Sequence, residues 1–120
     1  MMELPPYAAM LGLRMEGRQL CMPFAAHLIG SPGLLHGGSI AGLMEIAANM
    51  AVAAAAGDGA AVKPIGVTVE YMRGGAAADV LAEAKIMRLG RRIANVRVEA
   101  WQDDPEKPIA AAWVNLMIER

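Results

Sequence analysis

The side chain with the clearest chemical potential in this sequence is a single carboxylate, Glu45. It is the only Asp, Glu, Lys or Arg between His36 and Asp58, in a stretch made mostly of Ala, Leu, Ile, Met, Val and Gly. At helical spacing its neighbours are small or polar: Gly38, Ala41, Gly42, Ala48 and Asn49. Such a stripe is typical of a helix that lines a ligand channel, with Glu45 as general base or nucleophile and Asn49 as a polar partner. The alternative is a structural carboxylate, either exposed to solvent or hydrogen-bonded in the core.

The segment directly before this stretch, His36-Gly37-Gly38, is a candidate site for stabilising negative charge. Backbone N–H groups in the first turn of a helix lack intrahelical acceptors and favour a developing anion. Glycine at both positions lets a substrate carbonyl approach the backbone closely. The sequence therefore predicts an oxyanion hole at Gly37 and Gly38, with a flexible glycine turn as the alternative.

The spacing of these two features has a consequence for assembly. Gly37 and Glu45 are eight residues apart, which corresponds to about 12 Å along a helix. Reacting atoms must approach to about 3 to 3.5 Å, so one substrate carbonyl does not contact both groups of one chain. Two antiparallel helices related by a two-fold axis bring the acid of one chain to the N–H of the other. We therefore expect a homodimer with two shared sites.

The elements that must position these residues follow from hydrophobic periodicity. One long helix is predicted over residues 39–56, with Gly57 as its stop signal and with Ile40, Leu43, Met44, Ala47 and Met50 as its packing face. A short helix is expected at 7–11, a hairpin at 13–24, and strands at 65–72, 79–89, 94–101 and 109–118. Consecutive strands with short turns predict an antiparallel sheet wrapped around one central helix, an α+β fold.

Composition restricts the class of protein further. A chain of 120 residues with 56% hydrophobic and 19% charged residues is expected to form one domain, 1–120, with a substantial core. The formal net charge of −1 argues against a nucleic-acid partner. Cys21 is the only cysteine, which excludes an intrachain disulfide and a cysteine-based zinc site. No basic leader precedes an apolar segment, and Glu45 and Asn49 interrupt the apolar stretch, so we expect a cytoplasmic protein that is not in a membrane.

Three segments carry a resemblance to a known family: 33–49 with its His36-Gly37-Gly38 and the acid nine residues after the histidine, 67–73, and 88–96. The chain resembles the hotdog-fold acyl-CoA thioesterases of the PaaI-like and 4-hydroxybenzoyl-CoA thioesterase type from about Leu11 onward. The resemblance implies a hotdog fold, a homodimer often paired into a homotetramer, and hydrolysis of a small to medium acyl- or aryl-CoA thioester without a cofactor or metal.

The resemblance also implies roles for individual residues. Glu45 matches the catalytic acid, Gly37 the N–H that polarises the thioester carbonyl, Asn49 a polar helper and His36 a positioning residue. In the family the region that holds Arg73, Arg91 and Arg92 meets the phosphates and nucleotide of CoA. The sequence departs from the family at Gly30, where many members carry Asn, and at 63–64, where some carry a Ser or Thr that orients water.

Two other functions stay open. A hotdog dehydratase or hydratase shares the helix motif, but its paired histidine stands fourteen residues before the acid, whereas here His27 and His36 precede Glu45 by eighteen and nine. This spacing favours hydrolysis. A non-catalytic acyl-CoA-binding protein that retains the pocket is the second alternative.

Overall fold

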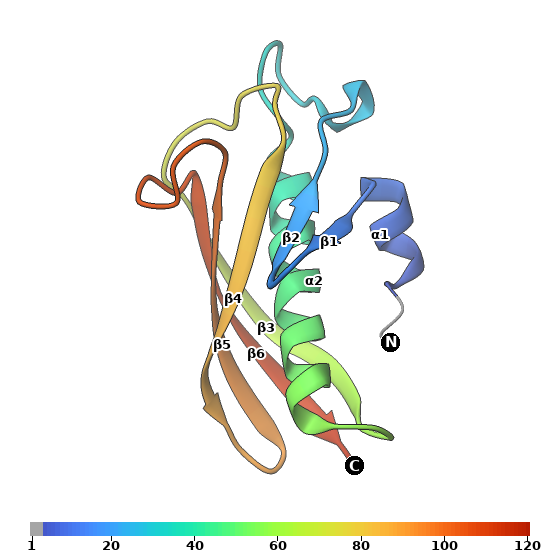
Figure 1. The fold of residues 1–120 in the computed structure, drawn as a ribbon. Helices are drawn as coiled ribbons and strands as arrows, with labels where there is room; N and C mark the ends of the chain where they lie inside the picture. The colour runs from blue at the N-terminus through green and yellow to red at the C-terminus, as the bar shows by residue number, and fades with distance from the viewer. Residues whose placement is uncertain (1–3) are drawn as a thin grey trace.

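The structure, a computed structural model, describes residues 4–120 as one antiparallel sheet curved around one long helix (Figure 1). The elements in chain order are α1 (Pro6–Leu11), β1 (Arg14–Glu16), β2 (Gln19–Met22), a 3₁₀ turn (Ala26–Leu28), α2 (Gly37–Ala56), β3 (Ala61–Tyr71), β4 (Val80–Leu89), β5 (Ile93–Trp101) and β6 (Ala110–Glu119). The predicted short helix, hairpin, long helix and four strands are all confirmed.

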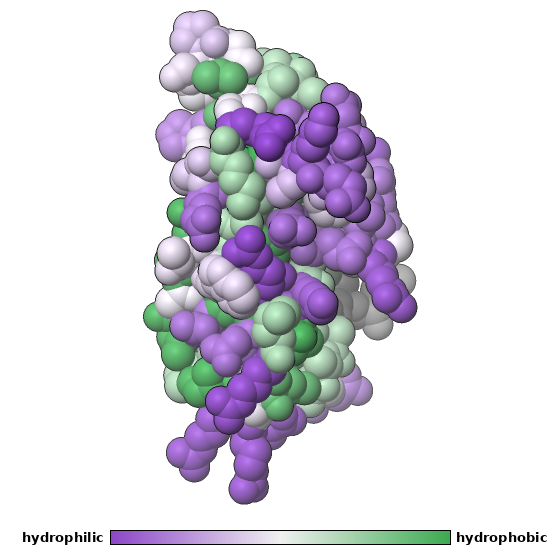
Figure 2. Space-filling model, turned by 90° about the vertical axis from the view of Figure 1, so that its left-hand side faces the viewer, coloured by the Kyte–Doolittle hydropathy of each residue, from purple (hydrophilic) through white to green (hydrophobic). Residues whose placement is uncertain are grey.

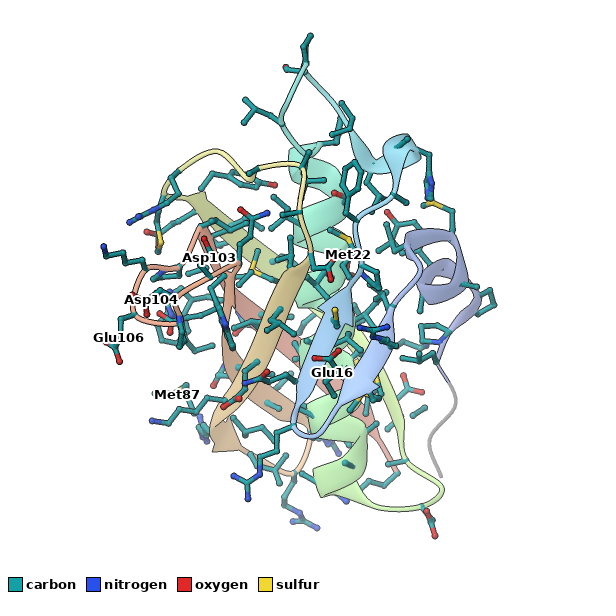
Figure 3. The ribbon with its side chains drawn as sticks, turned by 45° about the horizontal axis from the view of Figure 1, so that its top comes forward. Glu16, Met22, Met87, Asp103, Asp104 and Glu106 are labelled. Carbon is teal, nitrogen blue, oxygen red and sulfur yellow. The ribbon has the colours of Figure 1, made fainter. Side chains whose placement is uncertain are left out.

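The sheet has the strand order β1-β2-β4-β5-β6-β3, and every neighbouring pair is antiparallel. Strand β3 starts earlier than the alternation predicts and pairs with β6 from Ala61 to Tyr71, with a bulge between Pro64 and Gly66. A proline is tolerated here because β3 is an edge strand, where a missing N–H removes no ladder hydrogen bond on the open side. The turn between β5 and β6 is closed by Asp104, whose carboxylate accepts the Glu106 N–H at 2.9 Å (Figure 3).

Helix α2 lies against the concave face of the sheet and supplies the centre of the core. Leu43, Met44 and Val52 are fully buried, and they pack with inward-facing strand residues such as Val96 and Val114. By length and composition α2 could also cross a membrane, the one helix of residues 4–120 for which this holds. Core helices satisfy the same criterion, and its packing against the sheet accounts for its hydrophobicity.

The convex face of the sheet carries the alternate side chains and mixes polar with apolar groups (Figure 2). The Arg97 guanidinium lies 5.0 Å from the ring centre of Trp113, and the Asn95 amide donates to the Asn115 side-chain oxygen at 2.6 Å. Such cross-strand pairs fix the register of the central strands. The register in turn places the ends of the sheet: Tyr71 and Ala110 at one end, next to the start of α2, and Ile93 with Met117 toward the other.

Candidate active site

Glu45 lies in the middle of α2, half-buried, at a cavity of about 400 Å³. The cavity is bounded by the beginning of α1, by α2 and by the edge strand β3, and its lining includes Pro5, Tyr7, Asn49, Met50 and Pro64. None of the hydrogen bonds or ion pairs found within residues 4–120 engages the Glu45 carboxylate. The structure therefore favours the interpretation of Glu45 as a group facing a ligand cavity over a carboxylate bound into the core.

Helix α1 forms one wall of this site, and it explains a glycine that the sequence analysis assigned to the channel. A Cβ atom on Gly42 would lie 2.9 Å from the Tyr7 ring and 3.1 Å from a Leu11 methyl. Gly42 is thus small because α1 crosses α2 there, and Ala48 is small because it is fully buried in the core. The predicted stripe of small residues is therefore only partly a channel lining.

Met50 packs against the core, as predicted from its place on the helix face with Leu43 and Ala47. Its half-buried side chain also lines the Glu45 cavity, which the helical pattern does not predict. The first half of α2 is covered more completely than the second, so Met50 is left partly open. A helical pattern alone does not reveal how far the neighbouring elements extend.

Asn49 lies one turn after Glu45 and lines the same cavity, as predicted. Its amide nitrogen donates to the Val62 carbonyl of β3 at 3.4 Å, which ties the helix to the edge strand. The amide oxygen accepts no hydrogen bond from residues 4–120 among the contacts found. Asn49 therefore has an acceptor available next to Glu45 for a water molecule or a substrate group.

The N-terminus of α2 is built around His36, which is the N-cap residue. Its Nδ1 accepts the Gly38 N–H at 2.9 Å, and its own backbone N–H donates to the Leu28 carbonyl at 2.8 Å. This cap starts the helix at Gly37, two residues before the predicted start. The Gly38 N–H already donates to the imidazole. Of the two predicted oxyanion donors, only the Gly37 N–H has no acceptor within residues 4–120.

Tyr71, the last residue of β3, is a site residue that the sequence analysis did not identify. Its hydroxyl donates to the Gly37 carbonyl at 2.9 Å, and its ring lies where a side chain on Gly37 would go, with a Cβ only 3.2 Å from the ring. The contact joins residues 34 positions apart. The alternation in β3 places Tyr71 on the inner face, but no sequence signal shows that it reaches the helix terminus.

Gly30, one of the two departures from the family pattern, is in close contact with the helix cap. A Cβ atom at this position would lie 2.9 Å from the His36 Cα and 3.1 Å from its Cβ. The Gly30 N–H donates to the Leu34 carbonyl at 3.0 Å, which holds the loop closed over His36. In this chain the loop is therefore built around glycine, and it leaves no room for the asparagine of the resembled family.

We expect Gly30→Asn to destabilise the protein by about 1 to 3 kcal/mol, the usual cost of overpacking. The new Cβ collides with the His36 Cα and Cβ, which cannot move away from it as the end of a flexible side chain would. Chemical denaturation measures the loss, with Ser31→Asn as control because Ser31 is exposed on the adjacent position. Equal stability of the two variants would contradict the close packing at Gly30.

The three predicted CoA-binding arginines lie at two ends of the chain's sheet. Arg73 follows β3, and its backbone N–H donates to the Ile109 carbonyl, at the end near Gly37. Arg91 and Arg92 are exposed in the β4–β5 turn. There they line an open hollow of about 1160 Å³ together with Arg88 and Arg120, near the C-terminal end of α2. Within one chain the structure does not bring Arg73 together with the other two.

Cys21, the only thiol, is excluded as a nucleophile. It is 2% exposed, within the core. Burial and, secondarily, the negative charge of Glu16 raise the pKa of the Cys21 thiol, so it is protonated at neutral pH.

The acidic residues of the β5–β6 loop, Asp103, Asp104 and Glu106, lie away from α2 (Figure 3). Glu45 is thus the acid around which this site is built.

Comparison with solved structures shows chains of the same architecture. A conserved protein from Pseudomonas aeruginosa superposes with a TM-score of 0.89 at 25% identity, covering 96% of this chain and 94% of that one. A phenylacetic acid degradation-related protein from Ralstonia eutropha gives 0.85 at 24% identity, covering 97% and 92%. A Bacillus halodurans protein solved with CoA gives 0.86 at 18% identity, covering 94% and 75%.

Sequence comparison identifies the family. No protein of curated function matches the chain. The model of the thioesterase superfamily matches residues 32–109, which is more than half of the chain and includes the His36-Gly37-Gly38 segment, Glu45 and both groups of arginines. The chain has the hotdog fold that the sequence analysis predicts, and it belongs to the thioesterase superfamily.

Proposed function

We propose that this protein is an acyl-CoA thioesterase that hydrolyses a small to medium acyl- or aryl-CoA thioester to the free acid and CoA. The observation that carries the proposal is the Glu45 carboxylate, which has no partner within residues 4–120 and lies at a cavity of about 400 Å³ in a member of the thioesterase superfamily. A similar fold in a protein solved with CoA supports CoA as the carrier of the acyl group.

The proposed active unit is a homodimer formed along β3. One side of this strand of 11 residues pairs with β6, and the other side is open, with Ile65 and Val67 exposed beside it. A long open edge with apolar side chains is a template for pairing with another strand. Antiparallel pairing of two β3 strands about a two-fold axis sets two α2 helices antiparallel, so that Gly37 of each chain approaches Glu45 of the other.

The chemistry follows from these groups. In one route the Glu45 carboxylate takes a proton from water as the water oxygen bonds to the thioester carbon, and the Asn49 oxygen orients that water. The Gly37 N–H and the N-terminal dipole of α2 stabilise the oxyanion. Collapse of the intermediate breaks the C–S bond, and the CoA thiolate leaves and takes up a proton. In the other route Glu45 itself attacks, and water then cleaves the resulting anhydride.

The proposal is tested with purified protein and a panel of acyl- and aryl-CoA thioesters, by following the release of free thiol. Turnover above the rate of the buffer is the expected result. Pro64 lines the Glu45 cavity and offers no hydroxyl to orient water, which is the observation that favours the alternative of a non-catalytic acyl-CoA-binding protein. Tight binding of the thioesters without thiol release would establish that alternative.

We further propose that Arg91 and Arg92 hold the phosphates of CoA and take no part in the reaction. A contact between a guanidinium and a phosphate is charge-assisted. Its loss raises the Michaelis constant by about tenfold or somewhat more, and it leaves the turnover number nearly unchanged because the interaction is equal in ground and transition states. For Arg91→Ala/Arg92→Ala we therefore expect a higher KM for CoA thioesters and a nearly unchanged kcat.

The matching measurement uses the same acyl group on a truncated pantetheine thiol, which lacks the nucleotide and its phosphates. Its KM is expected to be the same for the wild type and the double variant. Lys107→Ala is the control for loss of an exposed cation, because Lys107 lies in the β5–β6 loop. If both substrates are weakened equally, or neither is, the two arginines are ordinary surface charges.

A further inference from the structure

A second cavity lies on the other side of Met50 from the Glu45 cavity. It has a volume of about 300 Å³ and lies between α2, the β1–β2 hairpin and β4. Its lining is mostly small and apolar and includes Met15, Ala47, Met50, Ala51, Ala54 and Ala84. The cavity opens to solvent where Met15, Ala54 and its one charged lining residue, Arg18, are exposed. Alanines on both the helix and the strand keep this space open.

Met50 is the side chain that the two cavities share. Around the axis of α2 it lies between Glu45 and Asn49 on one side and Ala51 and Ala54 on the other. The Met50 side chain is half-buried, unbranched and flexible, and it changes rotamer more easily than a β-branched or aromatic residue in the same place. Met50 therefore separates the two cavities, and a change of its rotamer is the movement that would connect them.

We infer that the second cavity receives the distal part of an unbranched acyl chain whose thioester carbonyl lies at Glu45, and that Met50 determines the length of chain accepted. This inference rests on the proposed function. The cavity wall offers an alkyl chain apolar surface and no buried polar partner, so the part of the ligand that enters it is hydrocarbon. A linear chain bends around Met50, whereas a rigid aryl group stays in the Glu45 cavity, so the preferred substrates are linear acyl-CoAs of medium length.

The test compares wild-type protein with Ala54→Met and Met50→Ala on linear acyl-CoAs from butyryl to lauroyl. Binding is measured in parallel with S-alkyl-CoA thioethers of the same lengths, which have no carbonyl to hydrolyse. Each methylene transferred from water to an apolar cavity increases affinity about fourfold, so affinity of the wild type is expected to rise with chain length until the cavity is filled.

Ala54→Met fills the second cavity, and it is expected to reduce the preference for octanoyl over butyryl by about tenfold or more. Met50→Ala joins the two spaces and is expected to move the optimum to longer chains.

Ala55→Met is the matched control, because Ala54 and Ala55 are both exposed but only Ala54 lines the second cavity. The inference is overturned if thioether affinity is independent of chain length, or if Ala54→Met and Ala55→Met give the same profile. It is also overturned if Ala54→Met changes the oligomeric state and not the chain-length profile, since a second copy of the chain would then cover this face. Length-dependent thioether binding without any hydrolysis supports the inference and refutes the proposed function. Hydrolysis with a thioether affinity that is independent of chain length supports the proposed function and overturns the inference.

Discussion

Replacement of Glu45 by Gln is expected to reduce the turnover number by about 10² to 10⁴-fold, the usual contribution of a positioned general base. Glutamine has nearly the same size and shape, so the packing of the cavity around Tyr7, Asn49 and Pro64 is retained. What the variant loses is the ability to take a proton or to attack the carbonyl. The measurements are thiol release at saturating acyl-CoA and the affinity for an S-alkyl-CoA thioether.

The control for this variant is Asp58→Asn, which removes the same charge from an exposed position just after α2. It is expected to retain wild-type turnover. The thioether affinity of Glu45→Gln is expected to stay close to that of the wild type, because the carboxylate contributes to the reaction and not to holding CoA. A loss of turnover smaller than about tenfold would be too small for a catalytic base and would remove Glu45 from the mechanism.

Single-turnover hydrolysis in water enriched in heavy oxygen separates the two routes open to Glu45. A general base leaves the carboxylate oxygens untouched, so the label enters only the released acid. A nucleophile forms an anhydride, and attack of labelled water on its Glu45 carbon leaves label in the protein. Mass spectrometry of the peptide that contains Glu45 therefore detects the covalent route.

The sequence predicted the fold well because its elements are specified locally. The change of hydrophobic period from 3.6 to 2 after Gly57 separates the helix from the strands. Glycine at 57, with φ of 89°, ends α2 where the pattern predicts. The start of α2 was predicted two residues late because His36, unlike Ser, Asp or Asn, is not among the common cap residues. Its imidazole fulfils that role here by accepting the Gly38 N–H.

The candidate site was predicted less completely, because its walls come from elements distant in the sequence. Glu45 and Asn49 share one helix face and were found by spacing alone. The position of Tyr71 against Gly37 depends on the curvature of β3 around α2, and no local pattern encodes that curvature. The spacing pattern places Gly42 in the channel, because a glycine that admits a ligand and one that admits a crossing helix look the same in the sequence.

The Gly37 N–H, which has no partner within residues 4–120, and the Glu45 carboxylate are separate features of one chain, and in the proposed mechanism they act together only across a dimer. Glu45 faces its cavity from the middle of α2, whereas Gly37 is at the start of the helix under the Tyr71 ring. Their separation of about 12 Å along the axis exceeds the reach of a single carbonyl group. The proposed dimer along the open edge of β3 would bring the two groups together without any change in the fold, so that each active site would depend on two chains.

Subunit complementation tests this dependence directly. Glu45→Ala and Gly37→Pro are each expected to be inactive, the second because proline lacks the N–H. The backbone of the first helical position accepts proline, but the Tyr71 ring, 3.2 Å from a Cβ at Gly37, must shift, so the fold of Gly37→Pro is checked by circular dichroism before mixing. After mixing and subunit exchange, a heterodimer contains one site with both defects and one intact site. At equal amounts and random exchange, half of the dimers are heterodimers with one working site each, so about a quarter of wild-type activity is expected to return.

Mixing Glu45→Ala with a chain that carries both substitutions restores no site and serves as the control. If tagged subunits demonstrably exchange and the first mixture stays as inactive as the control, each chain contains a complete site of its own and the shared arrangement is wrong.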